Sequence, residues 1–99
     1  MAMHAAALRA ELRIPAVRSL KEKRHRLRMV TTDLRKSFPA IGISEVDHQD
    51  QWQRTTIGVV AVAPQAGHLQ RLLHSIQRQL EARPDVEVLE VGISHLEQP

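Results

Sequence analysis

The segment EVDHQDQWQR holds the densest group of side chains in this sequence that could do chemistry. Its oxygen and imidazole groups, which could bind a divalent cation or form an acid–base pair, come from Glu45, Asp47, His48 and Asp50. The spacing matches no metal pattern, because an EF-hand loop beginning at Asp47 would need a glycine where Trp52 stands. We therefore predict no catalytic residue and no metal ligand here.

A structural role suits the same segment better. Aspartates between two strands accept hydrogen bonds from loop amides, so Asp47 and Asp50 can organise a turn. We expect Trp52 to cover an edge of the core and Arg54 to pair with a nearby carboxylate. The predicted structural motif, with a second functional site as the alternative, comprises Asp47, His48, Asp50, Trp52 and Arg54.

Other catalytic devices are missing from the sequence. Its four glycines are scattered, so it has neither a phosphate loop nor a nucleophile elbow. An acylphosphatase would need a glycine-rich phosphate loop near the first strand, and ELRIPAVRSL offers no glycine. The chain also has no cysteine, which excludes disulfides, thiolate metal sites and cysteine nucleophiles. We expect a protein that is not an enzyme and uses no cofactor.

Six elements would position these side chains, according to the apolar periodicity. Alternation from Ala6 to Ile14 predicts a strand, and Pro15 ends it. Ser19 and Glu22 have the spacing of a capping box at the start of a helix. The further predicted elements are strands at 41–46 and 55–63, a helix at 68–80 and a strand at 85–96 with a bulge near Val88.

This order of elements predicts an α+β fold, a ferredoxin-like β-α-β-β-α-β sandwich in a single domain over residues 1–99. Its four antiparallel strands would carry both helices on one face. The first and third strands would be central. The second would lie at an edge, where Glu45 and Asp47 would discourage pairing with another chain.

Charge is divided unevenly along the chain. Residues 1–36 hold ten of the 14 Lys and Arg and three of the 11 Asp and Glu, a net of +7, whereas the remainder carries −4. On the helix at 19–38, several of these cations fall on one face beside the apolar face, with no acid among them. We call this set the cationic stripe: Lys21, Arg24, Arg28 and Arg35, with Arg18 at its start.

The cationic stripe suits the phosphate backbone of RNA, and an ordinary solvated helix face explains it equally well. RNA-recognition motifs share the predicted topology but stack bases on aromatic residues of the sheet. Phe38 and Trp52 are the only aromatic residues of this type, and neither lies in a central strand. If RNA is bound, contact with the backbone through the helix is therefore the expected mode.

The helix-free face of the predicted sheet has an apolar part. Ala5 and Ala7 would point away from the helices, and the third strand would add either Val60 and Val62 or Ile57, Val59 and Ala61. Ferredoxin-like domains often cover such a face with a ligand or another subunit, so a homodimer is a fair expectation.

Three segments carry a resemblance to a known family: SLKEKR at the first helix, EVDHQDQWQR between the middle strands, and TIGVV after it. The chain resembles the YlxP-like family of small bacterial proteins. The resemblance implies a ferredoxin-like fold and a cytoplasmic protein, often encoded beside translation and ribosome-maturation factors, whose biochemical activity is not established.

These observations together favour a non-enzymatic module associated with RNA or a ribosomal subunit. The alternative is a dimeric domain that senses a small ligand or binds another protein. No apolar run approaches the roughly 20 residues of a membrane span, and the start of the chain has no signal-peptide core, so we expect a cytoplasmic location and no membrane partner.

Overall fold

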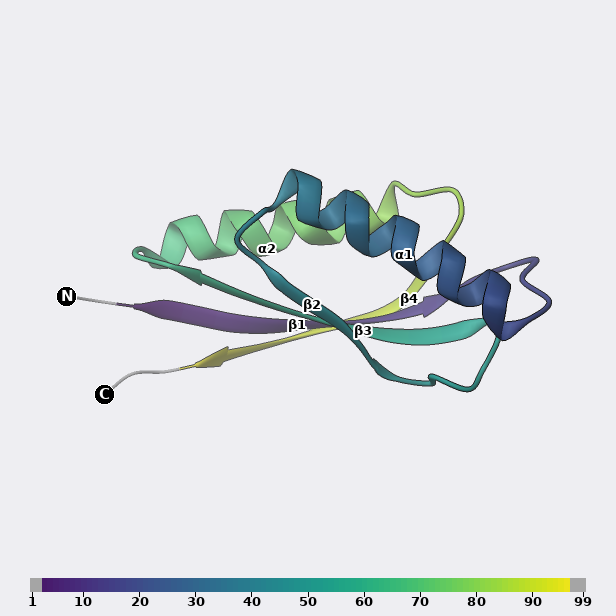
Figure 1. Cartoon of the computed structure of the whole chain (residues 1–99). Helices are drawn as coiled ribbons and strands as arrows, with labels where there is room; N and C mark the ends of the chain where they lie inside the picture. Colours follow the sequence, from purple (N-terminus) through teal and green to yellow (C-terminus); the bar gives the residue numbers. More distant parts are fainter. Residues whose placement is uncertain (1–2, 97–99) are drawn as a thin grey trace.

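The computed structural model describes residues 3–96, which form four strands and two helices in the predicted order (Figure 1). Both helices cover the same face of the sheet. Neither helix of this described part is long and apolar enough to cross a membrane. The elements are β1 (His4–Arg13), α1 (Leu20–Ser37), β2 (Gly42–Asp47), β3 (Arg54–Ala63), α2 (Ala66–Glu81) and β4 (Glu87–Leu96).

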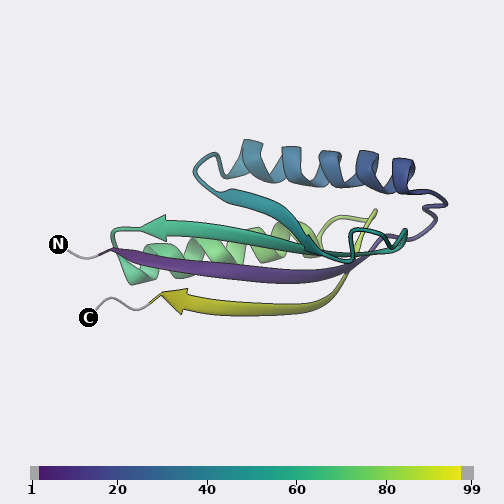
Figure 2. The ribbon, with the colours of Figure 1, turned by 60° about the horizontal axis from the view of Figure 1, so that its bottom comes forward.

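The four strands pair antiparallel in the order β2-β3-β1-β4, which Figure 2 shows from below. β1 and β3 are central and β2 lies at an edge, as predicted. The pairing of β1 with β4 shifts at Glu11 and Leu12, which face Glu90 and Val88, so Leu89 has no partner. This irregularity confirms the predicted bulge, and the topology confirms the ferredoxin-like fold.

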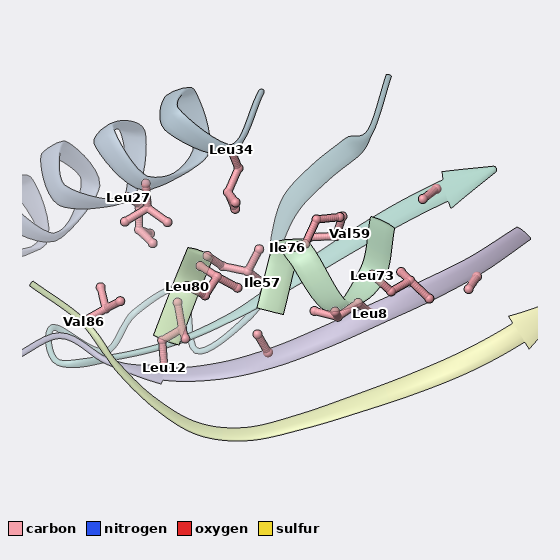
Figure 3. Packing of buried hydrophobic residues seen from close by; sticks show 14 of the residues in the cluster. Leu8, Leu12, Leu27, Leu34, Ile57, Val59, Leu73, Ile76, Leu80 and Val86 are labelled. Carbon is pink, nitrogen blue, oxygen red and sulfur yellow. The ribbon is translucent and has the colours of Figure 1, made fainter. Parts of the chain in front are cut away.

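The two-residue period of the central strands separates a buried face from an open one. Leu8 and Leu12 of β1 are fully buried toward the helices, together with Ile57 and Val59 of β3. In Figure 3 they pack against Leu27 and Leu34 of α1 and against Leu73, Ile76 and Leu80 of α2. Val60 and Val62 are 57% and 61% exposed on the other face, which settles the orientation that the sequence left open.

The two helices begin differently. At α1, the Ser19 hydroxyl accepts a hydrogen bond from the Glu22 amide at 3.1 Å. The Glu22 carboxylate in turn accepts one from the Arg18 amide at 2.9 Å, so two amides at the helix start are satisfied. α2 begins after Gln65 without a side-chain cap. Its position depends on the burial of its apolar face in the core.

Candidate nucleic-acid interface

The helix α1 turns one flank toward α2 and the opposite flank toward the edge strand β2. On the inner flank, the Asp33 carboxylate accepts a hydrogen bond from Arg83 at 2.6 Å, and Arg26 donates to the backbone oxygen of Asp85 at 2.9 Å. On the outer flank, Arg35 donates to the backbone oxygen of Ile43 in β2 at 3.3 Å. The cationic stripe follows this outer flank.

Every member of the cationic stripe is exposed to solvent. Within residues 3–96, none of its side chains forms an ion pair. Of the acids of α1, Asp33 is bound to Arg83, and the Glu22 carboxylate caps the helix start at the amide of Arg18, the first residue of the stripe. From Lys21 to Arg35 the predicted cations lie exposed on one flank, and Glu22 stands at the N-terminal end of that row.

The ion pair of Arg83 with Asp85 is the best-defined charge pair on the inner flank. Arg83 approaches both carboxylate oxygens of Asp85, at 2.9 and 2.8 Å, in a two-pronged geometry. The hydrogen bonds from Arg83 lower the pKa of the Asp85 carboxyl, against the opposing effect of partial burial. The pKa of Arg83 is raised, chiefly by the hydrogen bond with Asp85. Arg83, just after the end of α2, thus contacts α1 through Asp33 and is oriented by Asp85.

Lys23 is a buried residue of the segment SLKEKR that the sequence analysis did not single out. Its side chain is only 1% exposed, and its ammonium group lies 3.0 Å from a carboxylate oxygen of Glu45. It also donates to the backbone oxygens of His48 and Gln49. The same oxygen of Glu45 accepts a hydrogen bond from the Thr55 hydroxyl at 2.6 Å. A buried network thus joins α1 to β2, to β3 and to the loop between them.

Glu45 was expected, together with Asp47, to discourage another chain from pairing at the edge of β2. The structure shows its side chain 22% exposed and paired with Lys23. A buried ammonium group needs a negative partner, and that requirement decides the direction of the side chain. Asp47, which is 56% exposed, still lies at the edge.

The predicted turn contacts of EVDHQDQWQR are partly present. One oxygen of Asp47 accepts a hydrogen bond from the His48 amide at 2.7 Å, and the other lies 3.8 Å from Arg9. His48 has a positive φ of 62°, and its ring nitrogen lies 3.2 Å from the side-chain amide of Gln51. The Gln51 amide donates to the His48 carbonyl at 3.1 Å, which closes the turn.

Asp50 and Trp52 differ from the expectation. Asp50 is exposed and accepts no hydrogen bond from any residue between 3 and 96, so its predicted role as a loop acceptor is wrong. Trp52 is 52% exposed, so the prediction that it covers the core is wrong too. The turn is closed by the backbone and by Lys23, which leaves both side chains free to face solvent.

Arg54 behaves as predicted, since it lies 3.8 Å from the carboxylate of Glu11 in the neighbouring strand. Its Nε atom and the hydroxyl of Thr56 are buried without a hydrogen-bond partner in the described residues.

His48 lies 4.0 Å from Asp47, but residues 3–96 contain no group of three or more His, Asp or Glu arranged to hold a metal ion. The segment thus forms a structured turn that presents one aromatic side chain.

A shallow apolar hollow lies at one end of the sheet. Its volume is about 450 Å³, and it has no Lys, Arg, Asp or Glu among its lining residues. Ala5 of β1 pairs with Val62 of β3 and with Leu96 of β4, and Gly42 of β2 pairs with Val60, so all four strands contribute to it. The exposed valines Val60 and Val62 of the helix-free face are among its lining residues.

The antiparallel sheet and the two helices on one face define a ferredoxin-like α+β protein, here with an exposed cationic helix flank. Residues 5–93 match the family described as "Protein of unknown function (DUF503)", and the chain belongs to this family. It is 35% identical to the uncharacterized protein YlxP of Bacillus subtilis (strain 168) over 69 residues, which cover 70% of this chain and 74% of that protein. The predicted resemblance is thereby confirmed.

Among solved structures, the chain is similar to the de novo designed protein Foldit4, with a TM-score of 0.57. The match covers 99% of this chain and 100% of the designed one, at 10% identity. A likeness at this identity shows the fold alone.

Proposed function

We propose that this protein is a non-enzymatic, cytoplasmic module that binds the phosphate backbone of RNA, either free or in a ribosomal subunit, through the cationic stripe. The observation that carries the proposal is the exposure of these cations with no acid among them. Two other charged side chains of α1 are taken up by partners, Lys23 by Glu45 and Asp33 by Arg83. The stripe cations, and Lys36 of the same helix, are exposed and have no ion pair among the described residues.

The geometry of α1 supports contact with several phosphates. A rise of 1.5 Å per residue makes the helical part of the stripe, from Lys21 to Arg35, about 21 Å long. Each cation that neutralises a phosphate releases bound counterions, so affinity falls steeply as salt rises. Contacts of this kind position a protein on RNA by backbone shape and read little base sequence. We therefore expect binding that is sensitive to salt and weakly selective for sequence.

The double variant Arg24→Glu/Arg28→Glu tests the proposal. We expect weaker binding to total ribosomal RNA and to 30S particles, and a salt dependence flatter by about one unit of slope for each phosphate that is no longer neutralised. Thermal melting should stay close to wild type, because both side chains lie outside the core. Binding should be measured across a salt series alongside the melts.

A matched control is available on α2, where Arg71 and Arg78 are not part of the stripe. The variant Arg71→Glu/Arg78→Glu makes the same change in net charge away from the stripe, and it should keep most of the affinity and the full salt slope. If the stripe variant folds and binds as tightly as wild type with an unchanged slope, the stripe is only a solvated helix face. An equal decrease in affinity in both variants would indicate attraction by net charge alone.

The apolar hollow supports a second candidate function, a dimeric domain that senses a small ligand or binds another protein. A second copy could cover Val60 and Val62, whose exposure in an isolated chain leaves apolar surface in water. Sedimentation velocity tests this candidate, because Val60→Lys should convert a dimer into monomers. A dimeric wild type without salt-sensitive RNA binding would favour this function over the first.

A further inference from the structure

Trp52 exposes 52% of its surface although it is the largest apolar side chain of the loop between β2 and β3. Burial of an aromatic ring is a major stabilising contribution in folding, and this indole gains only part of it. Its neighbours in the chain, Gln51 and Gln53, are exposed and polar. Trp52 is therefore the only apolar side chain in the loop from His48 to Gln53.

The loop that presents Trp52 is fixed on both sides of it. Before Trp52, the backbone oxygens of His48 and Gln49 accept hydrogen bonds from the buried ammonium group of Lys23. After it, the Gln53 carbonyl accepts a hydrogen bond from the Ile14 amide at 2.9 Å. The backbone that carries the indole is thus held in place before any ligand arrives, which lowers the entropy cost of binding.

These attachments also place Trp52 at the N-terminal end of the cationic stripe. The side-chain amide of Gln53 donates to the Val17 carbonyl at 3.2 Å, and Arg18 is the next residue. One residue of chain spans at most about 3.6 Å, so Trp52 lies within a few residue lengths of Arg18. In Figure 1 the loop between β2 and β3 lies beside the start of α1.

We infer that Trp52 is a stacking platform for an unpaired base of an RNA whose backbone follows the cationic stripe. This inference rests on the proposed function and adds the class of RNA, one with a single-stranded segment beside the site. Stacking on an aromatic ring needs only a flat exposed face and tolerates any base. A protein partner fits less well, because aromatic hot spots between proteins sit within closely packed, water-excluding surroundings.

Asp50 refines the geometry of the proposed complex. Its exposed carboxylate, two residues from Trp52, would repel a phosphate placed over the loop. The base should therefore lie on the loop while its phosphates lie over the stripe. Asp50→Asn should accordingly leave stacking intact and strengthen RNA binding modestly, by about 2- to 5-fold at low salt.

The test compares Trp52→Ala with wild type on two probes, a single-stranded RNA oligonucleotide and a blunt RNA duplex of the same length. Trp52→Ala should weaken binding of the single strand by roughly 5- to 100-fold, leave its salt slope unchanged and leave duplex binding nearly unchanged. Trp52→Phe should restore most of the affinity. Because Trp52 is the only tryptophan, its fluorescence in wild type should be quenched by the single strand and hardly by the duplex.

The outcomes separate this inference from the proposed function. If Arg24→Glu/Arg28→Glu weakens binding but Trp52→Ala does not, and no quenching occurs, the stripe binds RNA and the stacking inference is wrong. The inference would also be overturned if Trp52→Ala weakened binding of the single strand and of the duplex equally. It would be overturned too if RNA-free ribosomal proteins, and not RNA, quenched the fluorescence of Trp52. If wild type shows no salt-sensitive binding at all, the proposed function fails first.

Discussion

The ammonium group of Lys23 and the carboxylate of Glu45 lie 3.0 Å apart between α1 and β2, with Lys23 only 1% exposed. The pair joins the helix that carries the cationic stripe to the segment that carries Trp52. Lys23 reaches that segment twice more, through the carbonyls of His48 and Gln49. One buried lysine thus fixes the relative position of both surfaces for which we propose a function.

Removing this lysine should be costly to stability. Lys23→Met keeps the apolar stem but leaves the Glu45 carboxylate and two loop carbonyls without their partner. Breaking a buried ion pair from one side costs about 3–5 kcal/mol, and the partial exposure of Glu45 places our expectation at the low end, about 3 kcal/mol. Urea denaturation of the variant and of wild type measures the difference.

Adding Glu45→Gln to Lys23→Met tests how much of the lost stability comes from the unpaired Glu45 charge. It removes the uncompensated charge, so it should recover about 1–2 kcal/mol of the stability. Thr55 can still donate to the amide oxygen of the glutamine. A double variant less stable than Lys23→Met alone would contradict this view of the pair.

The lowered pKa of Asp85 predicts a pH-dependent contribution to stability. Because the folded-state pKa lies below the unfolded value of about 4, the contribution is fully present above pH 4 and is lost as the pH falls through the folded pKa. Asp85→Asn should cost about 1.5–3 kcal/mol at pH 7, the range for hydrogen bonds to charged groups. The difference between variant and wild type should shrink below pH 4, as measured by denaturation from pH 7 downward.

Asp50→Asn is a suitable control, since Asp50 has no hydrogen bond to a described residue. Its stability should follow wild type over the same pH range. A difference in the free energy of unfolding between Asp85→Asn and wild type that stays constant at every pH would mean that the ion pair with Arg83 does not lower the pKa of the Asp85 carboxyl.

The course of the chain was predictable because each element has an apolar face with a clear period. Lys23 was missed because its neighbours in SLKEKR are charged, although it lies on the same helical face as Leu27 and Val30, which are buried. That position on the helix was the signal available in the sequence. The exposure of Trp52 had no such signal, because hydrogen bonds from distant residues decide where a loop side chain points.

Ala16 provides a test of the connection before α1. Its φ of 65° is in the left-handed region, where a β-carbon is crowded, and its side chain is exposed. Ala16→Val should lower the free energy of unfolding by about 1–2 kcal/mol, because branched side chains tolerate this region least. Ala16→Gly should leave it unchanged or raise it by up to about 1 kcal/mol. Chemical denaturation of both variants checks the sign, and equal stabilities would exclude backbone strain here.

The cationic stripe itself should reduce the stability of the protein. Arg24 lies three residues after Lys21 and four before Arg28, and like charges at these spacings destabilise a helix by about 0.2–0.5 kcal/mol per pair. Arg24→Glu replaces two repulsions by attractions and puts an acid near the helix start, so it should raise the free energy of unfolding by about 1 kcal/mol at low salt. The gain should nearly vanish at about 1 M salt, where charges are screened beyond about 3 Å.

The sign of the change in the free energy of unfolding caused by Arg24→Glu distinguishes a binding surface from a solvated face. Arg71→Glu on α2 is the control, because the residues three and four positions away from it are Gly67, His68, His74 and Ser75, and it should change stability by less than about 0.5 kcal/mol. A face that only solvates the helix has no reason to keep repelling charges together. If Arg24→Glu stabilises the fold and weakens RNA binding, the arginine is retained for the ligand at the expense of the fold. A destabilised Arg24→Glu would instead show that the stripe supports α1, and the case for an RNA surface would lose its main support.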